Sequence, residues 1–209
     1  MSGFRGIQII WLAMLGVVLA VAHPSEKQRK PGLPANNGLV CWQEGVKLRW
    51  KDFEASRYPM EASLLDVRVG ACSATEVAVL PYTDAKGKSN FLVESFFIKK
   101  YSWVRDSSSA FNRITLDHEQ VHFDINELFA RKVRRVVAQY YLAGRYVFGP
   151  ELNQEISHLL EEKTAYNKAF DNDAYRDPSG WVVAKWQALV NQQLATLGAY
   201  ASTSATCSQ

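Results

Sequence analysis

The stretch "DHEQVHFDINELFARKVRR", residues 117–135, contains the pattern on which the prediction of the fold depends. Apolar side chains recur along it at spacings of three and four, the period of an α-helix. His118 and His122 lie four residues apart. On a helix their imidazoles project about 40° apart on one face and can bind the same metal ion, while Glu119 lies about 100° from His118, beside the metal. This spacing is typical of zinc hydrolases in which the glutamate acts as general base on the zinc-activated water.

The alternative is a charged amphipathic helix that carries two histidines and no metal. The context favours the metal site, because two of the chain's four histidines are in this stretch and a predicted strand directly precedes it. The sequence therefore predicts a centre with one zinc ion, with His118 and His122 as ligands and Glu119 as the catalytic residue.

Outward from this stretch, strands come first and helices second. Apolar or alternating segments at 46–50, 63–69, 76–82 and 91–103 are separated by turn residues and predict an antiparallel β-meander of three or four strands. The helical period begins after the serines at 107–109 and ends near Gly144. Two further helices are predicted at about 151–170 and 181–197, with a polar, turn-rich segment at 171–180 between them. This order predicts an α+β fold.

The N-terminus has the features of an export signal. Arg5 precedes an apolar run at 7–22, which ends in the small-residue triplet Ala20-Val21-Ala22. The run is shorter than the roughly 20 residues that span a bilayer, which argues against an uncleaved anchor. We predict a signal peptide at 1–22, a flexible lead-in at 23–38, a single domain at 39–198 and a disordered tail at 199–209. The protein is then exported, periplasmic or secreted, with no membrane span after cleavage.

Composition and charge point to an ordinary globular protein. The chain is 47% hydrophobic and 22% charged, and its formal net charge is only +3, so no nucleic-acid partner is predicted. The basic residues at 131, 132, 134 and 135 are interpreted as the solvent side of the long helix, offset by acidic residues nearby. A peptide or protein substrate is the partner that the zinc motif implies.

The chain has three cysteines, Cys41, Cys72 and Cys207. An oxidising compartment allows one disulfide among them. Cys41–Cys72 is the favoured pair, as a structural staple of the N-terminal part, and a bridge to Cys207 stays open. The cysteines lack the short paired spacing of a zinc site.

A third protein ligand is expected, because catalytic zinc normally has three. The extended motif with a further histidine is absent, since Leu128 occupies that position. The candidates lie on or after the second predicted helix. They are Glu155, His158, Glu161, Glu162, Asp171 and Asp173.

Three segments together resemble a known family. "LRWKDF" at 48–53, "KKYSWV" at 99–104 and the helix motif with its His-Glu-Gln-x-His-Phe-Asp-Ile core are similar to a bacterial domain family of unknown function, whose members are described as predicted secreted zinc-dependent proteases. The resemblance extends from about Lys47 to the third helix. It implies a zincin-like fold and a zinc-dependent peptidase activity.

The same resemblance narrows the choice of the third ligand. The family's Tyr-Asp-x-x-Thr-x-His-Gly stretch is matched here by "FDNDAYRD" at 170–177, with Asp171 at the aspartate, Ala174 at the threonine, Arg176 at the histidine and Asp177 at the glycine. If the aspartate is the ligand, Asp171 supplies it, and Asp173 is the second candidate. If the histidine is the ligand, this chain has lost it, because an arginine stays protonated and cannot bind zinc. The protein is then a degenerate, non-catalytic zincin-like module that works in envelope recognition.

Other residues are assigned by their position around the helix. Asn126 lies about 80° from His118 and is predicted to support the ligands by a hydrogen bond. Asp124 faces away and is expected to hold the helix, to Arg131 or to a neighbouring strand. Tyr166 and Tyr175 are candidates for stabilising an oxyanion. The segment at 91–104 leads directly into the helix, so the sheet is expected to border the cleft and to offer an edge to an extended substrate.

Overall fold

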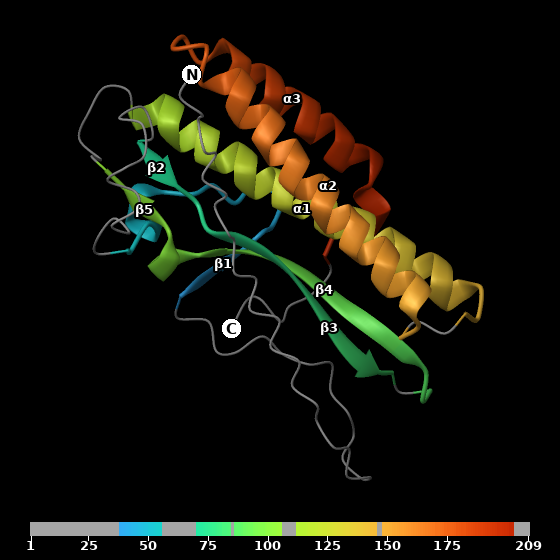
Figure 1. Ribbon diagram of the computed structural model, residues 1–209. Coiled ribbons are helices and arrows are strands. Elements are labelled where there is room, and N and C mark those ends of the chain that lie inside the picture. The colour runs from blue at the N-terminus through green and yellow to red at the C-terminus, as the bar shows by residue number, and fades with distance from the viewer. Residues whose placement is uncertain (1–37, 56–69, 85, 106–111, 146–147, 203–209) are drawn as a thin grey trace, which may run out of the picture.

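The computed structural model describes residues 38–55, 70–84, 86–105, 112–145 and 148–202 (Figure 1). The strands come first: β1 (Leu39–Cys41), β2 (Ala71–Cys72), β3 (Thr75–Thr83), β4 (Ser89–Ile98) and β5 (Trp103–Val104). Three helices follow: α1 (Asn112–Leu142), α2 (Pro150–Ala174) and α3 (Trp181–Thr196). Short 3-10 turns occupy Trp50–Asp52, Lys99–Tyr101 and Gly198–Tyr200. The predicted α+β class, with strands before helices, is confirmed.

The strands form two small antiparallel sheets. In the larger sheet the order is β1-β4-β3, and in the smaller one β2 pairs with β5. β3 and β4 form a hairpin with Val79 opposite Val93, and its turn is stabilised because Asp84 Oδ1 accepts the amides of Lys86 and Lys88. β1 pairs with β4 and not with a sequence neighbour. The order is therefore not that of a simple meander. β1 covers β4 only at Phe96–Ile98, so β4 is an inner strand over those three residues.

The predicted strand at 46–50 is wrong. The backbone amide of Leu48 donates to Gln120 Oε1 on α1 at 2.9 Å, and the chain turns into a 3-10 helix at Trp50. Leu48 and Phe53 bury their side chains beside Phe97 and Phe123. Alternation in this segment therefore reflects packing against α1 and β4 rather than pairing in a sheet. The segment predicted as a strand at 63–69 lies outside the described residues.

Helix α1 is the central element of the molecule. Figure 1 shows the three helices side by side on one side of the strands, and α1 contacts β2, β3 and β4 as well as α2 and α3. One side of α1 packs Val121 and Ile125 against Phe170 of α2 and Val190 of α3. Another side packs Val133 against the β3–β4 hairpin. Burying a large apolar side chain stabilises the fold by about 1.5–3 kcal/mol, so these contacts determine where α1 lies.

Of the basic residues predicted on the solvent side of the long helix, Arg131 and Arg134 instead point into the protein. Glu127 is fully buried and accepts hydrogen bonds from Arg131 at 2.9 Å and from Arg134 at 2.9 Å. Arg131 also donates to the carbonyl oxygen of Leu194 at the end of α3, and Arg134 donates to those of Val93 and Tyr200. Burial of these charges is tolerated because each one is paired and hydrogen-bonded. They join α1 to α3, β4 and the C-terminal segment.

The ends of α2 and of the domain also differ from the predicted boundaries. α2 continues to Ala174, so Asp171 belongs to its last turn and not to a loop. The described part of the predicted tail, 199–202, is held in place, because Tyr200 accepts from Arg134 and Ser202 Oγ donates to Glu94 at 2.9 Å. The predicted signal peptide at 1–22 lies outside the described residues. Among the helices described, none has the length and apolar character needed to cross a bilayer.

The predicted Cys41–Cys72 disulfide is wrong. Cys72 is a free thiol, whereas Cys41 is disulfide-bonded. The two residues lie on different sheets, with Cys41 opposite Phe96 on β4 and Cys72 opposite Trp103 on β5. The chain's remaining cysteine, Cys207, lies outside the described residues.

Candidate metal centre

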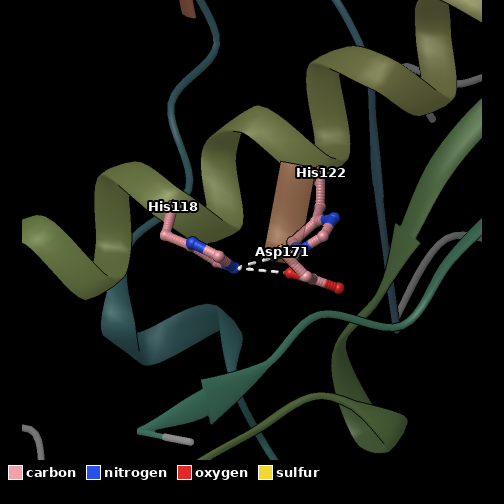
Figure 2. Close-up of side chains that lie close together, drawn as sticks. All are labelled: His118, His122 and Asp171. Carbon is pink, nitrogen blue, oxygen red and sulfur yellow. Dashed lines mark hydrogen bonds and ion pairs between the residues drawn. The ribbon is translucent and has the colours of Figure 1, made fainter. Parts of the chain in front are cut away.

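Three side chains from α1 and α2 converge at one point (Figure 2). His118 Nε2 and His122 Nε2 are 3.0 Å apart, and Asp171 Oδ1 lies 3.1 Å from the first and 3.0 Å from the second. The histidines lie on successive turns of α1, and Asp171 lies on the last turn of α2. The structure thus brings Asp171, the favoured third ligand, to the two histidines.

The convergence follows from the antiparallel packing of α1 and α2. His118, His122 and Asn126 are spaced by four residues on α1, as are Lys163, Asn167 and Asp171 on α2. The two rows make three successive contacts. Asp171 contacts both histidines, Asn167 contacts His122, and Lys163 donates to Asn126 Oδ1 at 3.0 Å. Side chains four residues apart share a helix face, so a single packing register of α1 and α2 sets all three contacts.

Asn167 determines the tautomer of His122. Asn167 Nδ2 donates to the backbone carbonyl of Lys163, which directs the amide oxygen towards His122 Nδ1 at 2.6 Å. That oxygen can only accept, so Nδ1 carries the proton and the Nε2 atom of a neutral His122 presents a lone pair to the centre.

The charges of the cluster favour a cation at its centre. Burial would by itself raise the pKa of Asp171, but hydrogen bonds from both histidines hold it well below its usual range. Burial would lower the pKa of His122, but the hydrogen bond to Asp171 and the charges of Glu119 and Asp171 raise it instead. The protein therefore stabilises positive charge at this point, and a metal ion can supply the charge in place of a proton.

The donor set fits a zinc ion. Ligand atoms at about 2.0–2.1 Å from a tetrahedral zinc lie roughly 3.3 Å from one another. The observed separations between the two Nε2 atoms and Asp171 Oδ1 are 3.0–3.1 Å, so a small outward shift suffices. Two imidazoles and one carboxylate are also a known ligand set of catalytic zinc.

Glu119 lies beside the cluster and is held by the backbone. Its carboxylate is almost fully buried, and Oε2 accepts the amide of Ser73 at 2.8 Å. Ser73 directly follows β2, so the smaller sheet positions the predicted base. Burial, and then the charges of Glu119 and Asp171, raise the pKa of the nearby Cys72 thiol to about 12. Cys72 therefore stays protonated beside the two carboxylates.

Aromatic rings surround the histidines. The ring of Phe170, fully buried, lies 4.4 Å from that of His118 and 5.0 Å from that of His122, measured between centroids. The ring of Tyr175 stacks on that of His118, with 5.8 Å between the ring centroids, and Tyr175 is 44% exposed. Tyr175 is therefore at the mouth of the site and stays a candidate for stabilising an oxyanion.

Several predicted site residues lie elsewhere. Asn126 donates to the Glu76 carbonyl and to Ser95 Oγ, so it joins α1 to the sheet and supports neither histidine. The hydroxyl of Tyr166 donates to Gln193, and Asp173 accepts from the Trp186 indole, so neither faces the cluster. The remaining third-ligand candidates on α2 are also directed elsewhere. Glu155 accepts a hydrogen bond from the Tyr140 hydroxyl, and His158 pairs with Glu162. Neither Glu161 nor Glu162 is part of the cluster.

Two further predictions concern the sides of these helices. Asp124 does face away from the metal ligands, but its partners are Trp42, Gln120 and Gln187 and not Arg131. Arg176, on which the expectation of a lost histidine ligand rested, follows α2 and is exposed.

The residue that the sequence analysis missed is Asn167. Its signal is the four-residue spacing to Asp171, which places both on one face of α2. The spacing has meaning only once α2 is known to continue through Asp171.

Replacement of Asn167 by leucine should weaken zinc binding by about 10–100-fold, the range typical of outer hydrogen-bond partners of a metal ligand. Leucine cannot accept the proton of His122 Nδ1, whereas Asn167→Asp keeps an acceptor there and should preserve the affinity. Competition with a chromophoric chelator measures the zinc affinity of both variants. Asn153→Leu, at an exposed position of the same helix, is the control, and a leucine variant at 167 that binds as tightly as the parent would refute this role.

Comparisons with family models, with curated proteins and with solved structures found no match to this chain.

Proposed function

We propose that this protein is an exported zinc-dependent metallopeptidase with a zincin-like fold. The observation that carries the proposal is the convergence of His118, His122 and Asp171 on one point, with Glu119 buried beside them. The His-Glu-x-x-His spacing of the helix motif supports the same activity. The disulfide at Cys41 supports export, because disulfides persist in oxidising compartments.

In the proposed mechanism, His118, His122 and Asp171 would hold the zinc ion. A bound zinc would supply a water of lowered pKa and polarise the substrate carbonyl. Glu119 accepts the proton of the attacking water and returns it to the leaving amine. The amide of Ser73 keeps the Glu119 carboxylate in place through Oε2. Tyr175, beside His118, donates to the oxygen that becomes negative as the carbonyl is attacked.

Two histidines and one carboxylate also bind iron(II) in oxygenases. The residue that favours hydrolysis is Glu119, because a buried carboxylate beside the metal ligands is suited to accept a proton from water. Metal content after purification without chelators distinguishes zinc from iron directly.

The test of the proposal compares zinc-loaded and metal-free protein on a broad peptide library, with products identified by mass spectrometry. We expect cleavage by the zinc-loaded protein, its loss on chelation and its recovery when zinc is restored. Protein that binds zinc at equal stoichiometry and cleaves nothing would refute the peptidase and favour the non-catalytic envelope module.

A further inference from the structure

A small pocket opens directly beside the metal centre. It lies between the start of α1, the end of α2, the start of α3 and strand β2, and its volume is about 110 Å³. His118 and Glu119 form part of its wall. A substrate side chain in this pocket would therefore belong to a residue that flanks the reacting carbonyl. The pocket is thus continuous with the proposed catalytic centre.

Part of the pocket wall is aliphatic. Ile114, Ala174 and Val183 line it from the three helices, and Ala71 lines it from β2. Ala71, Ala174 and Val183 are buried and belong to packed core clusters, so the wall is fixed before any substrate binds. A fixed apolar wall selects an apolar side chain of matching size.

The size of the pocket sets an upper limit on that side chain. An enclosed apolar cavity of about 150 Å³ binds benzene. The volume here is smaller, about 110 Å³, and fits a branched aliphatic group better than an aromatic ring. Gly70 and Thr115 both line the pocket, and a Cβ at Gly70 would lie 3.3 Å from Thr115 Cγ2, so a larger residue at Gly70 would crowd this part of the wall.

Two acidic residues in the wall of the pocket disfavour an acidic side chain. Glu119 and Asp177 both contribute to its wall. Asp177 accepts the hydroxyl of Ser179 and the amides of Val182 and Ser179, and these bonds hold the pKa of its carboxyl below the usual range, so it stays ionised just before α3. A substrate carboxylate here would meet two like charges.

We infer that this pocket selects a small aliphatic side chain, of the size of alanine, valine or leucine, at a residue flanking the bond that is cleaved; the inference rests on the proposed peptidase activity. The specificity-determining residues are Ile114 and Gly70, which control the depth and the width of the pocket.

The test measures competition between two peptides in one tube, identical except for leucine or phenylalanine beside the cleaved bond. The parent should prefer leucine by at least about tenfold, since a misfit of one methylene or more in an apolar pocket is worth about 10–200-fold. Ile114→Ala deepens the pocket and should raise cleavage at phenylalanine relative to leucine by about tenfold. Gly70→Ala narrows it and should shift the preference from leucine towards alanine. The ratio of the two cleavage rates, measured in one tube, does not depend on the fraction of the protein that is folded.

Val182→Ala is the matched control, because Val182 is a partly buried aliphatic residue of the same core cluster that does not line the pocket. It should leave the ratio unchanged. A parent that cleaves beside phenylalanine and leucine equally, or an unchanged ratio in both Ile114→Ala and Gly70→Ala, overturns the pocket assignment and leaves the peptidase standing. A zinc-loaded parent that cleaves no peptide overturns the proposed activity and this inference with it.

Discussion

Glu119→Gln should lower peptide hydrolysis by about 10²–10⁴-fold, the usual contribution of a general base, while zinc binding stays intact. Glutamine has the size of glutamate, and its amide oxygen can still accept the Ser73 amide that Glu119 Oε2 accepts. It cannot take a proton from water. Because Glu119 is not one of the three converging metal ligands, its replacement leaves the donor set unchanged. The measurements are kcat/KM on the best library peptide and zinc stoichiometry by elemental analysis.

Asp117→Asn is the control for the removal of a negative charge near the site. Asp117 is exposed and lies two residues before Glu119 on α1. Its replacement should leave hydrolysis within a few-fold of the parent. If Glu119→Gln were as active as Asp117→Asn, Glu119 would not be the base, and the proposed mechanism would have to be abandoned.

Asp171→Asn should lose zinc, with an affinity at least about 100-fold below that of the parent and therefore beyond the range of outer hydrogen-bond partners. The replacement keeps the shape of the side chain and its place in the last turn of α2, but it removes the negative charge that both imidazoles contact at 3.0–3.1 Å. A neutral amide oxygen is a weaker zinc ligand than a carboxylate, so hydrolysis should be lost together with the metal. Chelator competition and a cleavage assay measure the two effects separately.

The chain contains its own control for this prediction. Asp173 is two residues further along α2, and its carboxylate accepts a hydrogen bond from the Trp186 indole at 3.1 Å instead of facing the histidines. Asp173→Asn should keep both zinc and activity. If instead Asp173→Asn released the metal and Asp171→Asn retained it, the third ligand would be wrongly assigned. Circular dichroism of both variants establishes that a loss of zinc is not a loss of fold.

Much of the centre could be predicted from sequence because its first part is local. His118, Glu119 and His122 lie within five residues, and helical geometry alone places two imidazoles on one face with the carboxylate beside them. The period of the apolar residues likewise predicted all three helices and the order of strands before helices. These features depend only on spacing along the chain.

Pairing between distant segments was predicted poorly. The alternation at 46–50 resembles a strand, yet Leu48 bonds to a side chain of α1. Cys41 and Cys72 both lie in the N-terminal part of the chain, yet they are held on different sheets by β4 and β5. The charged residues of α1 resemble a solvent face, yet Glu127 is buried with two arginines that reach α3 and β4. In each case the partner lies far along the chain, so local pattern carries no information about it.

The sequence by itself determined the helix, the two histidines and the glutamate beside them, because a helix repeats with the same geometry wherever it forms. Only the tertiary structure decided which acid joins the histidines. That choice depends on α2 continuing through Asp171 and on the register in which its row of Lys163, Asn167 and Asp171 meets the opposite row of α1. Asn126 and Tyr166 were excluded in the same way, by the hydrogen bonds that they make to the sheet and to α3. The packing of α2 on α1 sets this register, and it is a property of both helices together.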